Sequence, residues 1–162
     1  MAVARPDWPK RHILGIIGAI TAPSRRKGKR VVQAYSMQGF EIRIDGQVLE
    51  MRTDGTRTAA MGRDPGRSFE TFLANTHVTG ILFDVRGADY QLDKIEWEER
   101  ARLIARICQG HPTAFVNRQD QDNQVARVLH HLEARGGRGL SCRSRQAARI
   151  WLGGVTDHPG SR

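Results

Sequence analysis

The polar residues best placed for chemistry lie in the stretch VRGADYQLDK, which follows a short apolar run and precedes a helical pattern. Arg86, Asp89, Tyr90 and Asp93 stand close together in it. If the apolar run is a buried strand, these side chains gather at its carboxyl end, where open α/β sheets form their binding crevices. We therefore interpret residues 86–94 as a contact loop for a partner. The same residues would also suit a solvated connection in which Asp93 only caps the next helix.

Other groups that could support catalysis or metal binding have unsuitable spacing. His130 and His131 are neighbours on a predicted helix, so they point about 100° apart and cannot jointly hold a metal. The RGGRG sequence at 135–139 ends a helix, so it presents carbonyl groups and not the amides that cradle phosphate. Asp120 and Asp122 lack the further acids, the glycine and the final glutamate of a calcium loop. We therefore expect no enzyme, no bound metal and no cofactor.

The two cysteines, Cys108 and Cys142, are too few and too far apart for a disulfide framework or a tetrahedral metal site. Each falls on the apolar side of its predicted element, which indicates a small buried side chain in a reducing compartment. With 162 residues, 39% of them hydrophobic, the chain has the composition of one soluble domain. No apolar run reaches the roughly 18 residues of a membrane span, and the expected location is cytoplasmic.

The positive charge of the chain is concentrated at its amino end. Residues 1–36 hold eight Lys or Arg against one acid, Asp7, while the formal charge of the whole chain is +9. We interpret this segment as a basic, disordered extension, and a chain beginning at Met37 would lose no predicted element. The SRRKGKR run suggests an arm for nucleic acid or a membrane surface as an alternative. The apolar run 13–22 is similar to a signal-peptide core, but Pro23 follows where a cleavage site should finish.

Several segments read as strands. Residues 40–45 and 47–53 alternate apolar with charged side chains, and the Asp-Gly dipeptide between them predicts a β-hairpin with one wet face. Residues 81–85 are almost wholly apolar, as expected of a central strand covered on both faces. Further short strands are predicted at 113–116 and 140–143.

Four helices complete the pattern. Residues 54–66, with three glycines and a proline, are expected to form a loop, after which Ser68 caps the first helix. Asp93 and Glu96 have capping-box spacing at the start of the second, and Ser144 caps the last. The helices are predicted at about 68–75, 93–108, 123–135 and 144–152.

Side-chain periodicity assigns the faces of two of these helices. In the second, Glu96 with Arg100 and Glu98 with Arg102 have the spacing of outward ion pairs. The apolar stripe of that helix contains Trp97, Ala101, Ile104 and Cys108. In the last helix, the residues expected to face inward are Ala147, Ala148, Ile150 and Trp151.

The element order is β-β-α-β-α-β-α-β-α. It predicts an α/β fold in which a mostly parallel sheet of four to five strands, preceded by a β-hairpin, has helices packed against it. The domain should span residues 37–154, followed by a loose tail at 155–162.

This order, together with three local features, resembles the STAS domain of anti-sigma-factor antagonists, and especially its SpoIIAA-like relatives. The features are the strand GILFDVRG with Asp84 near its end, the helix beginning at Asp93, and the closing pattern SRQAARIWLGG from Ser144. The match covers roughly 40–153. The resemblance implies a bacterial, non-enzymatic regulatory domain that docks another protein, such as a regulatory kinase or sensor.

The chain departs from the phosphorylated members of that family at one position. Their strand is followed by a loop ending Asp-Ser-Ser/Thr-Gly, with a phosphoserine at the start of the next helix. Counting from Asp84, Asp93 stands at the position of that serine, and Lys94 and Ile95 follow it. A phosphorylation switch is therefore not expected here, and Asp93 is either a permanent negative charge or only a helix cap.

We expect the following residues to form the partner-binding surface: Arg86, Asp89, Tyr90, Gln91, Asp93, Lys94 and Trp97. Two other functions stay open. One is a carrier for a lipid or another small apolar ligand, held in a pocket between sheet and helices. The other is nucleic-acid binding through the basic amino-terminal segment.

Overall fold

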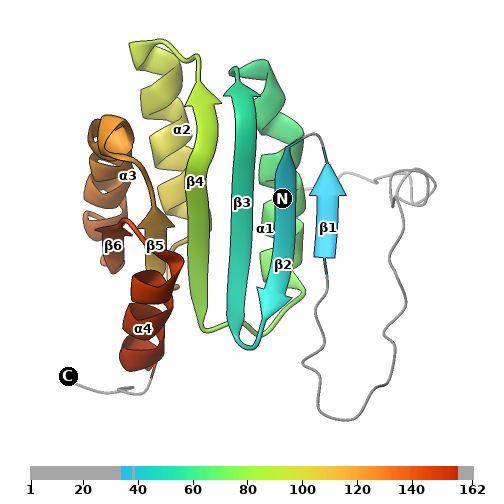
Figure 1. The fold of residues 1–162 in the computed structure, drawn as a ribbon, viewed down its shortest axis with the longest axis vertical. Coiled ribbons are helices and arrows are strands. Elements are labelled where there is room, and N and C mark those ends of the chain that lie inside the picture. The colour runs from blue at the N-terminus through green and yellow to red at the C-terminus, as the bar shows by residue number, and fades with distance from the viewer. Residues whose placement is uncertain (1–33, 38, 157–162) are drawn as a thin grey trace, which may run out of the picture.

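The computed structural model describes residues 34–37 and 39–156 and has a six-stranded sheet at its centre (Figure 1). Each strand pairs with its neighbour in the sequence. The strands are β1 (Ala34–Met37), β2 (Phe40–Asp45), β3 (Val48–Arg57), β4 (Gly80–Tyr90), β5 (Thr113–Val116) and β6 (Gly139–Cys142). The first two pairings are antiparallel, and β3 to β6 run parallel to one another. The predicted α/β fold with a mostly parallel sheet is confirmed.

Helices cover both faces of the sheet. They are α1 (Arg63–Ala74), α2 (Lys94–Ile107), α3 (Asp122–Glu133) and α4 (Arg145–Thr156). Helices α1, α2 and α3 pack on one face, and α4 packs on the other, over the parallel strands (Figure 1). The main core lies on the three-helix side, where Phe83 and Phe115 meet Phe69 of α1 and Ala101 of α2. A smaller core joins Leu82 to Leu152 of α4.

The hairpin and the central strand form as predicted. Gly46 has a φ of +67° between β2 and β3, a conformation that glycine adopts at little cost. Strand β4 pairs with β3 on one side and β5 on the other, and Ile81, Leu82 and Phe83 are each at most 4% exposed. Strand β4 is therefore buried on both faces, as its apolar sequence requires.

Strands β3 and β4 are both longer than predicted. Their pairing continues past a register shift between Arg52 and Asp54, and ends with Arg57 opposite Tyr90. A Cβ atom on Gly87 would lie 1.8 Å from Asp54 Oδ1, so glycine permits this close approach of the two strands. Glycine and polar residues indicated loops at both places, but backbone pairing with a neighbouring strand outweighs that local preference.

Three further boundaries differ from the prediction. Strand β1 begins inside the segment 1–36 that was predicted as an extension, whose residues 1–33 are outside the described part of the chain. Helix α1 begins at Arg63 and not after Ser68, because proline at position 65 is tolerated in a first helical turn. Helix α4 continues through Gly153 and Gly154 to Thr156, since glycine weakens a helix by only about 1 kcal/mol and does not by itself end one.

Candidate functional site

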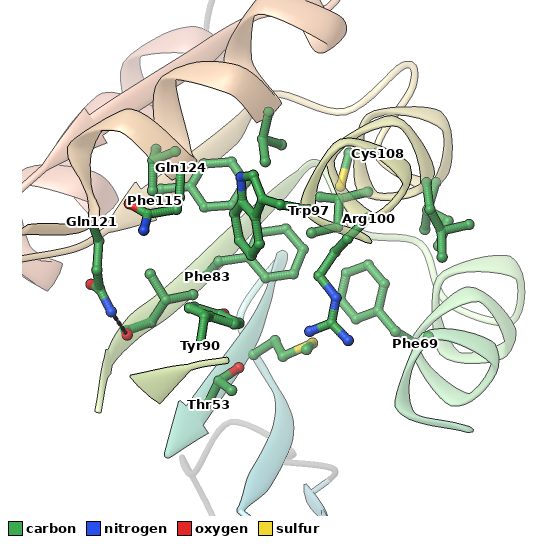
Figure 2. Close-up of a pocket in the computed structure, with 18 of the residues that line it drawn as sticks. Thr53, Phe69, Phe83, Tyr90, Trp97, Arg100, Cys108, Phe115, Gln121 and Gln124 are labelled. Atoms are coloured by element: carbon green, nitrogen blue, oxygen red, sulfur yellow. Dashed lines mark hydrogen bonds between the residues drawn. The ribbon is translucent and has the colours of Figure 1, made fainter. Parts of the chain in front are cut away.

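A cavity of about 80 Å³ lies between the sheet and helices α1, α2 and α3 (Figure 2). Four phenylalanines line it, one each from β2, α1, β4 and β5: Phe40, Phe69, Phe83 and Phe115. The ring centroid of Phe83 lies 5.2 Å from that of Phe69 and 4.9 Å from that of Phe115. Because separate elements hold these rings, the cavity exists only in the assembled fold.

Helix α2 forms the wall of the cavity that faces the sheet. Its predicted apolar stripe is confirmed, because Ala101 and Cys108 are buried and Trp97 and Ile104 pack against the main core. Of these, Trp97, Ile104 and Cys108 line the cavity. Positions three or four apart on a helix share a face, so Arg100 also reaches the cavity from this wall.

The predicted outward pair of Glu96 and Arg100 is wrong. Glu96 Oε2 instead accepts a hydrogen bond from the backbone N–H of Asp93 at 3.0 Å, as the second half of the capping box. The guanidinium of Arg100 lies near Tyr90 and Phe69 in the cavity, with its central carbon 6.0 Å from the Tyr90 ring centroid (Figure 2). The other predicted pair, Glu98 with Arg102, is confirmed at 3.0 Å.

Arg100 and Tyr90 form a polar end in this mostly apolar cavity. Burial lowers the pKa of Arg100, because the charged guanidinium loses water there. Burial also raises the pKa of Tyr90, although the charges of Arg100 and Arg57 and a hydrogen bond with Thr53 act in the opposite direction. Arg57 is 2% exposed and lies over the ring of Phe40, 4.1 Å from its centroid. The charges of two arginines therefore act on one tyrosine at this end of the cavity, where Arg100 is a lining residue and Arg57 lies outside the lining.

Two more polar side chains border the cavity near the start of α3. Gln121 Nε2 donates to the carbonyl oxygens of Val85 and Ala88 at 2.8 and 2.9 Å, which fixes the end of β4 beside α3. Trp97 packs edge to face with Tyr90 at 4.9 Å between centroids. Its Nε1–H is buried and has no acceptor among the described residues, so the cavity wall contains a donor that is not satisfied within the described protein.

The seven residues of the predicted contact surface separate into groups. Tyr90 and Trp97 line the cavity. The exposed residues are Arg86, Asp89, Gln91, Asp93 and Lys94. The prediction of a loop across 86–94 is wrong for its first half, because β4 continues to Tyr90 and only three residues separate it from α2. Local polarity could not reveal this extension, which depends on pairing with β3.

Arg86 belongs to a separate ion pair at the sheet. Its Nη2 lies 2.8 Å from Asp84 Oδ2, and Asp84 is 7% exposed. Burial raises the pKa of Asp84, but the hydrogen bonds and charge of Arg86 lower it by more, so the pKa of this carboxyl lies below its usual value. Neither Asp84 nor Arg86 lines the cavity of Figure 2.

The start of α2 is capped as predicted. Asp93 Oδ1 accepts hydrogen bonds from the backbone N–H groups of Ile95 and Glu96, both at 2.8 Å. Ile95 is 71% exposed, which is unusual for a large apolar side chain. A second hollow of about 250 Å³ lies between the starts of α2 and α3, and four of the seven residues of the predicted contact surface border it: Tyr90, Asp93, Lys94 and Trp97. The polar half of the predicted surface therefore lies next to an exposed apolar side chain.

The other residues considered for catalysis or metal binding, among them His131 and the two cysteines, make ordinary structural contacts. His131 Nε2 lies 2.8 Å from Glu98 Oε1. Cys108 is 1% exposed, burial raises its pKa to about 12, and both it and Cys142 are free thiols. Among residues 34–37 and 39–156, no group of three or more His, Cys, Asp or Glu is placed to hold a metal ion. In the same part of the chain, every helix is too short or too polar to cross a membrane.

No protein-family model and no curated protein sequence matches this chain. A solved structure of an uncharacterised protein of the DUF3478 family from Shewanella loihica PV-4, described as having a SpoIIAA-like fold, is similar over 75% of this chain and 92% of its own, with 15% identity and a TM-score of 0.50. The unphosphorylated anti-sigma-factor antagonist SpoIIAA aligns over 76% of this chain and 99% of its own, with 12% identity and a TM-score of 0.44. The chain therefore has the SpoIIAA-like α/β fold that its resemblance to STAS domains predicts.

Proposed function

We propose that this chain is a non-enzymatic regulatory domain of STAS type that binds a small, largely apolar molecule between its sheet and helices. The cavity lined by four phenylalanines is the observation that supports this function most strongly. Small-molecule sites are typically concave and apolar, with a few polar groups that orient the ligand. Tyr90, Arg100 and the indole N–H of Trp97 are such groups here.

A ligand in the cavity would also stabilise the fold. It would contact the four phenylalanine rings, and a molecule that binds only the folded state shifts the folding equilibrium toward that state.

Filling the cavity with a larger side chain should remove ligand binding. We expect the protein to bind one equivalent of 1-octanol in isothermal titration calorimetry, and Ile104→Trp to weaken this binding about tenfold or more, because the indole takes the space that the hydrocarbon needs. The matched control is Ile150→Trp, the same change at a 68% exposed position of α4, which should bind 1-octanol as the unchanged protein does. Equal binding by both variants, or no binding by the unchanged protein, would contradict the proposed function.

A second candidate function, the docking of another protein at the start of α2, is favoured by the exposure of Ile95. An apolar side chain that is 71% exposed beside the charged residues Asp93 and Lys94 has the composition of a small interaction surface. The same helix lines the cavity through Trp97 and Arg100. Helix α2 thus joins the two candidate surfaces, so one domain can have both functions.

The docking surface can be tested by affinity purification from the native host followed by mass spectrometry. We expect Ile95→Glu to lose a partner that Ile150→Glu retains, because both changes place a charge on an exposed isoleucine but only the first lies at the start of α2.

Two changes of Asp93 separate its roles as a charge and as a cap. Asp93→Ser keeps a capping oxygen and removes the negative charge, whereas Asp93→Arg removes both. If both variants lose the partner, the negative charge of Asp93 is needed for docking. If only Asp93→Arg loses it, Asp93 acts as a helix cap and its charge is not needed. Partner recovery unchanged by Ile95→Glu would rule out docking at this surface.

A further inference from the structure

Arg100 is a half-buried cation in the wall of an apolar cavity, and the charge of its nearest acidic neighbour, Glu96, acts on it without forming an ion pair. None of the ion pairs formed by residues 34–37 and 39–156 includes Arg100. Its Nη2 donates to the carbonyl oxygen of Thr58 at 3.5 Å, which is long for a hydrogen bond. A guanidinium has five N–H donors, and burying it without partners is costly. Most of these donors are therefore available to a ligand.

A second arginine lies near this end of the cavity. The charges of Arg57 and Arg100 are both close enough to act on Tyr90 and on each other. Arg57 also donates to the backbone carbonyl of Asp54. Tyr90 and Thr53 add hydroxyl groups at the same end. The cavity thus has a polar, hydrogen-bonding end, and the rings of Phe69, Phe83 and Phe115 form an apolar remainder (Figure 2).

We infer that the ligand is an amphipathic monocarboxylate whose carboxylate pairs with Arg100 and whose hydrocarbon tail lies among the phenylalanine rings. This inference rests on the proposed function of the cavity and adds the chemical class of its ligand. The two oxygens of a carboxylate match two parallel N–H groups of one guanidinium. A phosphate has a larger charge and more oxygens to satisfy, whereas a neutral molecule would leave the guanidinium of Arg100 without an ion-pair partner.

The test compares two probes of equal chain length, octanoate and 1-octanol, by isothermal titration calorimetry at neutral pH. The unchanged protein is expected to bind octanoate about tenfold more tightly than 1-octanol, the effect of a charge-assisted hydrogen bond. Arg100→Gln should bring the affinities for octanoate and 1-octanol to about the same value, and Arg100→Lys, which keeps the charge, should retain part of the preference. Arg102→Gln is the matched control, because Arg102 is exposed on the same helix and pairs with Glu98.

The outcomes separate this inference from the proposed function. If octanoate and 1-octanol bind equally to the unchanged protein, or if Arg102→Gln loses the preference as Arg100→Gln does, the carboxylate assignment is wrong and the apolar site remains. If neither probe binds, the proposed function fails and the inference fails with it. Binding of 1-octanol to Arg100→Gln also shows that this variant is folded, and Arg100→Lys provides a second test if it is not.

Discussion

Replacing Glu50 with alanine should lower the free energy of unfolding by about 3 kcal/mol, because it leaves several arginines without their shared counterion. Glu50 is 3% exposed on β3, and its carboxylate lies 2.6 Å from Arg43 of β2 and 2.5 Å from Arg145 of α4. Arg149, one turn further along α4, also pairs with it. The carboxylate thus joins two strands of the sheet to the helix on its second face.

The expected size of this effect follows from the exposure of the partners. Removing one member of a fully buried ion pair costs about 3–5 kcal/mol. Here the side chains of Arg43, Arg145 and Arg149 are 32–36% exposed, so water compensates part of the loss. Arg149 also keeps Asp45 as a partner at 2.6 Å. We therefore expect a value at the lower end of that range.

Urea unfolding followed by circular dichroism measures the change. Asp120→Ala is the control, because Asp120 pairs with Arg118 at 3.0 Å but its side chain is 66% exposed, and exposed pairs contribute about 0–1 kcal/mol. A loss below about 1 kcal/mol for Glu50→Ala would show that the network around Glu50 behaves as an ordinary surface ion pair.

Glu50 also illustrates which features the sequence could predict. Its alternation with apolar neighbours correctly predicts a strand, but it suggests a face open to water. Two of the three arginines that cover Glu50 come from α4, about one hundred residues later in the chain. The capping box at Asp93 and Glu96 depends on residues three apart, and for that reason it could be predicted in atomic detail.

The candidate site shows the same division between local and distant interactions. The α2 stripe was predictable from spacing, and so was the position of Trp97 on it. The cavity was foreseen only as an open alternative, since its rings come from four elements that are distant in sequence. The inward direction of Arg100 was missed because the capping box occupies Glu96, the carboxylate expected to pair with it. Sequence spacing alone does not decide between two partners of one side chain.

Helix α4 provides the clearest correction of a predicted face. Ile150 was expected to point inward, but it is 68% exposed, whereas Leu152 is fully buried and packs with Ala148 against Leu82. Residues 148 and 152 are four apart and share a helix face, while residue 150 is about 200° from residue 148 around the axis. The prediction weighted the apolar character of Ile150 above its position on the helix.

Leu152→Ala should therefore lower the free energy of unfolding by about 3 kcal/mol, within the usual range for a leucine removed from a packed core. Ile150→Ala removes the same number of carbon atoms from the same helix, yet its effect should stay within about 0.5 kcal/mol, since that side chain is already in water. Urea unfolding of the two variants side by side measures the difference. Comparable losses would mean that α4 packs on the sheet through a different face. The contact between α4 and the start of β4 is close, because a Cβ atom built on Gly80 would lie 2.9 Å from Leu152 Cδ2. Truncating the leucine should therefore leave a void at this contact.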